Sequence, residues 1–106
     1  MIVEQRTYTL HIGKTPEYFS LYESEGMAVQ TRILGNLIGY FRTEIGPLNQ
    51  VIHMWGYDSL DERTKRRAKL MADKGWLAYV AKIRPLMVTQ ESKILIPAPF
   101  SPIGGG

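Results

Sequence analysis

The segment 50–57, QVIHMWGY, carries His53, Trp55 and Tyr57 at alternate positions. If this segment is a β-strand, the three side chains face one side of a sheet, with neighbours about 7 Å apart. An imidazole titrates near neutral pH and can act as a general base or a haem ligand, an indole can stack on a ring, and a phenol can donate a proton. The pattern predicts a strand that lines a pocket or meets another protein surface.

Two further segments add candidates for the same site. Tyr8 lies in RTYTL near the start of the chain, and Arg42 alternates with Glu44 in a second β-rich segment. The ligand-binding candidates are Tyr8, Arg42, His53, Trp55 and Tyr57, and the best catalytic candidates are His53 and Tyr8. Each also has a purely structural interpretation, because interior strands hold hydrogen-bonded histidines, packed tryptophans and satisfied phenols. Arg42 and Glu44 can hold an anionic ligand or pair with each other at a subunit interface.

Composition excludes several kinds of chemistry. The 106 residues include no cysteine, which excludes disulfides, thiolate metal sites and a cysteine nucleophile. The two histidines, His11 and His53, lie on different predicted strands without a cluster of carboxylates, so we expect no metal site. The sequence also lacks a glycine-rich phosphate loop and a G-x-S-x-G elbow. We therefore expect no cofactor.

The basic run RTKRRAK, residues 63–69, is weak evidence for nucleic-acid binding. It lacks interleaved stacking aromatics, and Glu62 and Arg66 are spaced for an i,i+4 ion pair, so we expect no nucleic-acid partner. The chain shows no signal-like N-terminal segment and no apolar run near the ~20 residues that span a bilayer. These features predict a cytoplasmic protein without a membrane span.

The expected elements alternate between strand and helix. Strands are predicted at 2–12, 37–45, 50–57 and 91–97, with a turn at Gly46 between the middle two. A first helix is predicted over 15–34, with Thr15 as N-cap and with Gly26 on its apolar face for close packing. Ser59 and Glu62 form a capping box for a second helix, which is interrupted at 73–75 and then resumes. Residues 1–97 are the predicted domain, and 98–106 a flexible Pro/Gly tail.

This order of elements predicts an α+β, ferredoxin-like βαββαβ fold. Short connections and right-handed crossovers favour one four-stranded antiparallel sheet, in strand order 4-1-3-2, with the helices on one face. A tight turn in the hairpin would place Arg42 opposite His53 and Tyr40 opposite Trp55. Both sheet faces carry large side chains, but helices cover only one face. The other face requires a second subunit or a ligand, so we expect a homodimer.

Three runs give the chain a family resemblance. RTYTL, GYFRTEIGPLNQVIHMWGYDSLDER and KIRPLMVTQESKILIPAPFSP, which together extend over about residues 3–103, resemble the NIPSNAP family. The resemblance implies membership of the dimeric α/β-barrel superfamily, in which two ferredoxin-like sheets face each other. That superfamily includes cofactor-free monooxygenases, haem-dependent enzymes and isomerase-like proteins, and the NIPSNAP family itself has no agreed reaction. Fold alone does not choose among them.

Three functions remain open. The first is a NIPSNAP-type homodimer that binds a small hydrophobic or aromatic molecule in a pocket beside the sheet. The second is a non-catalytic protein-interaction or dimerisation module. The third is a cofactor-free monooxygenase or isomerase. A cavity beside His53 with convergent polar groups favours the first, and solid packing favours the second.

Overall fold

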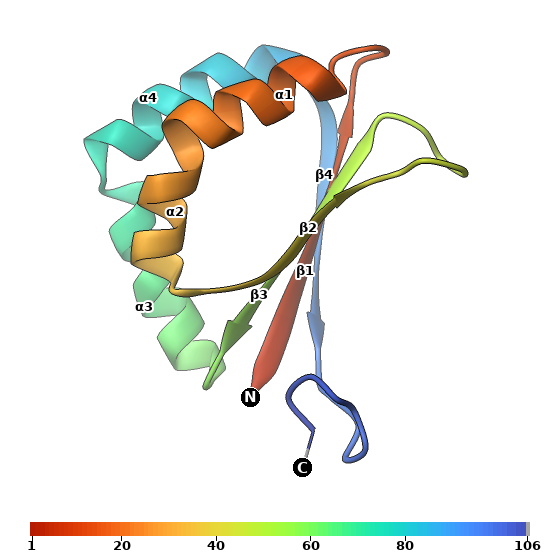
Figure 1. Cartoon of the computed structure of the whole chain (residues 1–106). Helices are drawn as coiled ribbons and strands as arrows, with labels where there is room; N and C mark the ends of the chain where they lie inside the picture. Colours follow the sequence, from red (N-terminus) through yellow and green to blue (C-terminus); the bar gives the residue numbers. More distant parts are fainter. Residues whose placement is uncertain (106) are drawn as a thin grey trace.

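The computed structural model describes residues 1–105, which form a four-stranded antiparallel sheet with every helix on one face (Figure 1). The elements are, in order, β1 (Ile2–Leu10), α1 (Thr15–Leu21), the π-helical η1 (Tyr22–Gly26), α2 (Met27–Leu34), β2 (Asn36–Arg42), β3 (Gln50–Tyr57), α3 (Leu60–Met71), α4 (Lys74–Ile83), the 3-10 turn η2 (Arg84–Leu86) and β4 (Met87–Leu95). The sheet order is β2-β3-β1-β4. The predicted ferredoxin-like fold and strand order are confirmed.

The first helical region is bent where a single straight helix was predicted. The π-helical turn η1 separates α1 from α2 and ends at Gly26. A Cβ atom at Gly26 would lie 2.8 Å from the Tyr79 ring, so only glycine lets α4 approach this closely. This confirms the packing interpretation of Gly26. The prediction of Thr15 as N-cap is wrong, because Thr15 is already helical and Lys14 precedes it without a side-chain cap.

The helices α3 and α4 each begin with a side-chain cap. The backbone N–H of Glu62 donates to Ser59 Oγ at 3.1 Å, which confirms Ser59 as the N-cap of α3. The Glu62 carboxylate in turn accepts from the backbone N–H of Asp58 at 2.9 Å. Asp73 caps α4 by accepting from the backbone N–H of Trp76 at 2.9 Å. The interruption is confirmed, but it lies at Ala72 and Asp73, because Lys74 and Gly75 of the predicted break already belong to the separately capped α4.

The predicted register of the β2–β3 hairpin is wrong by two residues at His53 and by three at Trp55. Tyr40, not Arg42, lies opposite His53, and Arg42 lies opposite Val51. Trp55 lies opposite Leu37, where Tyr40 was expected. The Tyr40 ring consequently stacks on the imidazole of His53, with ring centroids 4.6 Å apart and planes within 9° of parallel.

Two irregularities cause the shift in register. The connection between the strands covers residues 43–49, longer than a tight turn, and it contains Gly46 and Asn49 at positive φ values of 127° and 63°. The pairing also shifts between Leu37 and Gly39, as at a β-bulge. The connection sets the partner of His53, because the pairs from Arg42 to Gly39 share one register. The bulge adds one more residue of shift for the pairs beyond it, including that of Trp55 with Leu37.

The two faces of the sheet differ in their cover. The face toward the helices carries most of the core, including Tyr8, Leu10, Val51, Trp55 and Tyr57, all buried. The opposite face carries Phe41 of β2 and Ile52 and Met54 of β3. Phe41 pairs with Ile52, and Met54 pairs with Gln5 of β1, so these side chains share one face. No helix of residues 1–105 covers this open face, and Phe41 is 53% exposed on it (Figure 1).

Residues 98–105 form successive turns near the N-terminus (Figure 1). The backbone N–H of Ser101 donates to the carbonyl of Ala98 at 2.9 Å, and that of Gly105 donates to the carbonyl of Ser101 at 3.2 Å. The flexibility of this tail and the domain boundary at residue 97 stay predictions, and residue 106 of the predicted tail lies outside the described residues. Within residues 1–105, no helix combines the length and apolar character needed to cross a bilayer.

Candidate functional site

A cavity of about 450 Å³ lies between the sheet and the helices. This volume is within the range of about 300–1,000 Å³ that is usual for small-molecule sites. On the sheet side it is lined by β1, β3 and β4, and on the helix side mainly by α3 and α4. The apolar part of the wall consists of Met71, Leu77, Val80, Ile83, Met87 and Val88. His53 is among the lining residues, so the cavity lies beside the residue at which its presence was to distinguish ligand binding from solid packing.

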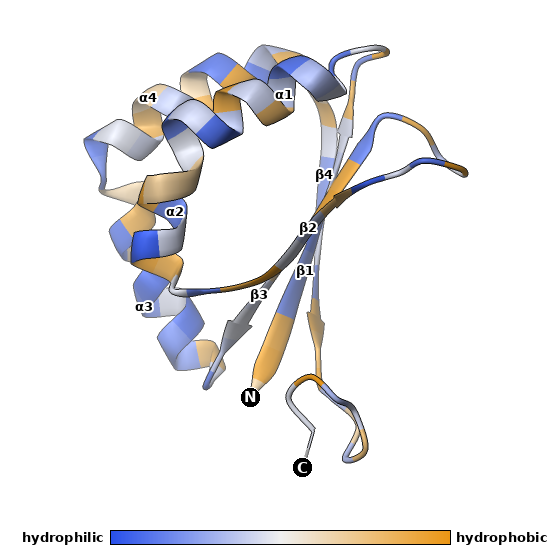
Figure 2. Ribbon diagram, in the orientation of Figure 1, coloured by the Kyte–Doolittle hydropathy of each residue, from blue (hydrophilic) through white to orange (hydrophobic). Residues whose placement is uncertain are grey.

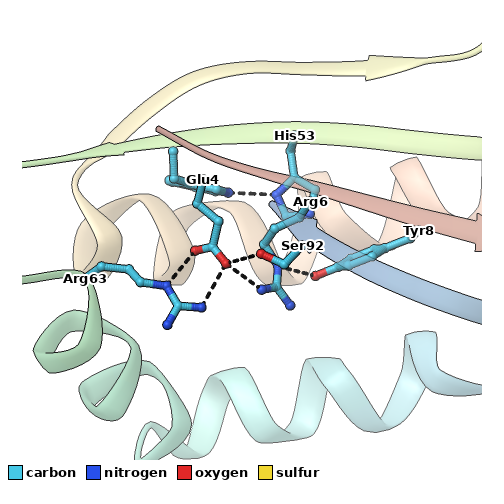
Figure 3. A network of polar contacts seen from close by, with 7 residues as sticks. Glu4, Arg6, Tyr8, His53, Arg63 and Ser92 are labelled. Atoms are coloured by element: carbon cyan, nitrogen blue, oxygen red, sulfur yellow. Dashed lines mark hydrogen bonds and ion pairs between the residues drawn. The ribbon is translucent and has the colours of Figure 1, made fainter. Parts of the chain in front are cut away.

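Glu4 is a buried carboxylate next to this cavity, with no exposed surface. Arg63 of α3 holds it with two hydrogen bonds, Nε to Oε1 at 3.1 Å and Nη2 to Oε2 at 2.9 Å (Figure 3). Arg6 Nη1 and Ser92 Oγ also donate to Oε2, at 3.0 and 2.6 Å. Burial alone would raise the pKa of Glu4, but the hydrogen bonds from Arg63 and Ser92 and the two guanidinium charges lower it to about 2.

Arg6 connects the buried carboxylate to the cavity wall. Its Nη1 donates to Glu4, its Nε donates to the Tyr8 hydroxyl at 3.1 Å, and its guanidinium carbon lies 5.6 Å from the centre of the Tyr8 ring (Figure 3). These contacts orient Arg6 from three directions. Both Arg6 and Tyr8 line the cavity.

His53 is fixed by three neighbouring rings. The indole Nε1–H of Trp55 donates to His53 Nδ1 at 2.7 Å. Tyr40 stacks on one face of the imidazole, and Tyr8 approaches it edge-on with ring centroids 4.9 Å apart. Because Nδ1 accepts a hydrogen bond, the proton of the neutral imidazole lies on Nε2. His53 thus presents a single N–H donor.

The protonation of His53 decides what it can do chemically. Burial lowers its pKa, and the positive charges of Arg6 and Arg67 lower it further, to about 3. The imidazole is therefore neutral at physiological pH. Its basic nitrogen is occupied by Trp55, so the ring is arranged to donate a hydrogen bond rather than to take up a proton.

Several buried polar atoms on the cavity wall have no hydrogen-bond partner within residues 1–105. They are Gln30 Oε1, His53 Nε2 and Trp76 Nε1. Leaving a buried donor or acceptor unsatisfied costs about 1–3 kcal/mol, so such atoms are normally paired. All three belong to residues that line the same cavity.

The structure brings only some of the predicted site residues together. Tyr8 and His53 lie on the cavity wall. Trp55 and Tyr57 are buried outside the lining, Trp55 as the partner of His53, and burial raises the pKa of Tyr57 to about 12. Arg42 lies away from the cavity in an exposed ion pair with a glutamate of the hairpin, at 2.6 Å.

Sequence reasoning missed four charged residues of the site. Glu4, Arg6 and Tyr8 alternate along β1, which places them on one sheet face. The helix α3 is hydrophilic over much of its length (Figure 2). Arg63, Arg67 and Met71 are spaced i,i+4 along it, and this stripe faces inward, because Arg63 bonds Glu4 and the other two line the cavity. Both spacings can be read from the sequence, but the basic run was considered only for nucleic-acid binding and for the pair of Glu62 with Arg66. Among residues 1–105, no three or more histidine, cysteine, aspartate or glutamate side chains lie together as a metal-binding group.

Comparison with known proteins gives one family. The sequence model of NIPSNAP matches residues 3–102. A curated relative, Protein NipSnap homolog of Dictyostelium discoideum, is 33% identical over 94 residues, which are 89% of this chain and 41% of that protein. The chain thus spans less than half the length of that relative, and 19% of a Caenorhabditis elegans protein, Putative NipSnap protein K02D10.1, that is also 33% identical.

Solved structures agree with this fold. The crystal structure of a NIPSNAP family protein with unknown function from Agrobacterium tumefaciens has a TM-score of 0.95 at 50% identity, and the match covers 97% of this chain and 93% of that one. An antibiotic biosynthesis monooxygenase has a TM-score of 0.66 at 12% identity, over 93% of this chain and 100% of that one. The second likeness is one of fold alone.

Proposed function

The chain belongs to the NIPSNAP family, and from this premise and the geometry of the cavity we propose that it binds a small, largely apolar molecule between its sheet and helices α3 and α4. The observation that carries the proposal is a largely apolar cavity whose lining includes Gln30, His53 and Trp76, each with a buried polar atom that has no hydrogen-bond partner within residues 1–105. A site that is mostly apolar, with a few polar groups aimed inward, is typical of small-molecule binding.

The apolar and the polar residues of the cavity wall have different roles in the proposed binding. Met71, Leu77, Val80 and Ile83 offer apolar surface, which favours a hydrocarbon or aromatic body by about 25 cal/mol for each Å² removed from water. The N–H groups of His53 and Trp76 and the Gln30 carbonyl set the orientation of the ligand's polar group. These contacts favour binding over proton transfer, because no free basic nitrogen of His53 faces the cavity. Cofactor-free monooxygenase or isomerase activity therefore remains the weaker alternative.

A cavity-filling variant tests the binding proposal. Val80 lies on the wall, and the next residue of α4, Ala81, is exposed and outside the lining. We expect a screen of small aromatic and aliphatic compounds, followed by amide chemical shifts, to find ligands that perturb His53 and Gln30. Val80→Trp should remove this binding and Ala81→Trp should leave it intact, with circular dichroism confirming that both variants fold. A wild type that binds none of the compounds, or ligands that bind Val80→Trp equally well, would contradict the proposal.

We also propose that the protein is a homodimer joined through the open sheet face. Phe41, Ile52 and Met54 lie on that face without an intrachain cover, and this observation equally favours the alternative of a non-catalytic dimerisation module. Sedimentation at micromolar concentration should give about twice the 12.1 kDa chain mass. Ile52→Lys should shift the mass toward that of one chain, and a monomeric wild type would contradict the proposal. A cytoplasmic location stays a prediction that cell fractionation checks.

A further inference from the structure

Positive charge exceeds negative charge at the inner end of the cavity. The Glu4 carboxylate is already held by Arg6 and Arg63. Arg67, one turn further along α3, lines the cavity and has no ion-pair partner within residues 1–105. The charged groups acting on it are Arg6 and Arg63, which repel it, and the shared Glu4. Glu4 thus pairs with two guanidinium groups and is the carboxylate whose charge also acts on the third, that of Arg67.

Arg67 is half-buried, which makes this imbalance costly. Burial and the charge of Arg6 both lower the pKa of Arg67, so the folded protein disfavours the very charge that the side chain carries. A charge removed from water is normally paired, and arginine pairs best with a planar anion through two parallel hydrogen bonds. An anion bound in the cavity that Arg67 lines would supply the missing partner.

We propose that the ligand is a hydrophobic organic acid, whose carboxylate binds Arg67 beside Arg6 and whose hydrocarbon part fills the apolar portion of the cavity. This inference rests on the proposed function and names the class of molecule that the same site takes. Two neighbouring donors, His53 Nε2–H and Trp76 Nε1–H, lack partners within residues 1–105 and supply further hydrogen bonds to an anion or its neighbouring polar group.

The rest of the lining fits a singly charged acid. Arg84 of η2 also lines the cavity and is exposed to solvent, so it attracts anions toward the site from outside. The helix-side wall of Met71, Leu77, Val80 and Ile83 is apolar, which suits a hydrocarbon tail and not a second anionic group. Arg67 is the partly buried guanidinium of the lining that lacks an ion-pair partner within residues 1–105, whereas Arg84 is exposed to water. One such group beside an apolar wall matches one carboxylate on an alkyl or aryl body.

Pairs of probes that differ only in charge test this inference. The probes are octanoate with octanamide and hydrocinnamate with hydrocinnamamide, each titrated into the full chain by calorimetry or amide chemical shifts. We expect at least one acid to bind about tenfold or more tightly than its amide, the size of effect that a charge-assisted hydrogen bond gives. Arg67→Gln should remove this preference by weakening the acid while leaving the amide unchanged.

Arg66 provides the matched control. It precedes Arg67 on α3 but pairs with Glu62 at 2.8 Å and with the carbonyl of Ile33 at 3.1 Å, outside the cavity. Arg66→Gln changes net charge equally and should leave the preference for the acid intact. Equal losses in both variants would overturn the inference, because the effect would then be one of overall charge.

Two other outcomes distinguish failure of the organic-acid inference from failure of the small-molecule binding on which it rests. If acid and amide bind wild type equally and Val80→Trp stops both, the cavity binds small molecules but the anion inference fails. If neither acid nor amide binds, and the compound screen also finds no ligand, both fail together.

Discussion

Replacing Glu4 by glutamine tests the most unusual electrostatic feature of this fold. The substitution keeps the size and most of the shape of the side chain but removes its charge. Arg63 and Arg6 then face a neutral amide in a buried position, close to a third guanidinium at Arg67. The carboxylate that joins β1, α3 and β4 through Arg63 and Ser92 is lost as well.

The magnitude follows from the pKa of Glu4. It is about 2 in the folded protein against an ordinary value of 4.5, and one pH unit corresponds to about 1.36 kcal/mol, so ionised Glu4 stabilises the fold by about 3 kcal/mol. Because the folded pKa is the lower one, this contribution is complete above pH 4.5 and is lost as the pH falls toward 2. Removing one partner of a buried ion pair typically costs about 3–5 kcal/mol, which agrees.

Urea unfolding measures this cost through the fluorescence of the two tryptophans. We expect Glu4→Gln to lower the free energy of unfolding by about 3 kcal/mol at neutral pH. The difference from wild type should shrink as the pH falls from 4.5 toward 2, because wild type then also carries a protonated Glu4. Glu62→Gln is the control, since Glu62 also pairs with an arginine but on the surface, and it should cost much less. A loss below about 1 kcal/mol, or one that does not change with pH, would refute the reasoning.

Three further predictions concern local features. Ser59→Ala should lower the free energy of unfolding by about 1 kcal/mol in urea without affecting ligand binding, and an unchanged value would show that the cap contributes nothing. Gly26→Ala should lower it by about 1–3 kcal/mol because the new methyl group meets the Tyr79 ring, whereas a rise in the melting temperature would mean that helix propensity decides there. His53 should stay neutral with its proton on Nε2 at all pH values well above its pKa of about 3, as nitrogen NMR can observe. Titration of His53 near the ordinary value of 6.5 would contradict the buried hydrogen bond from Trp55.

Local sequence signals determined the architecture of this protein. The alternation of strand-like and helix-like segments predicted the order of elements and the sheet order, and the capping box at Ser59 located the start of α3. The central motif around His53 also indicated the family, and His53 and Tyr8 do reach the cavity. These predictions succeeded because period, caps and turns depend on residues a few positions apart, whose interactions form in any tertiary context.

The composition of the site was decided only by the tertiary structure. The hairpin connection at residues 43–49 placed Tyr40 where Arg42 was expected, and a bulge between Leu37 and Gly39 shifted the pairs beyond it. The pairing of Glu4 with Arg63 joins residues 59 positions apart, so no local pattern contains it. Whether an arginine of the basic run faces water or the interior depends on the rotation of α3 against the sheet. Burial then links charge to hydrogen bonding, because a carboxylate that is fully removed from water, such as Glu4, is stable only when donors such as Arg63 and Arg6 pair with it.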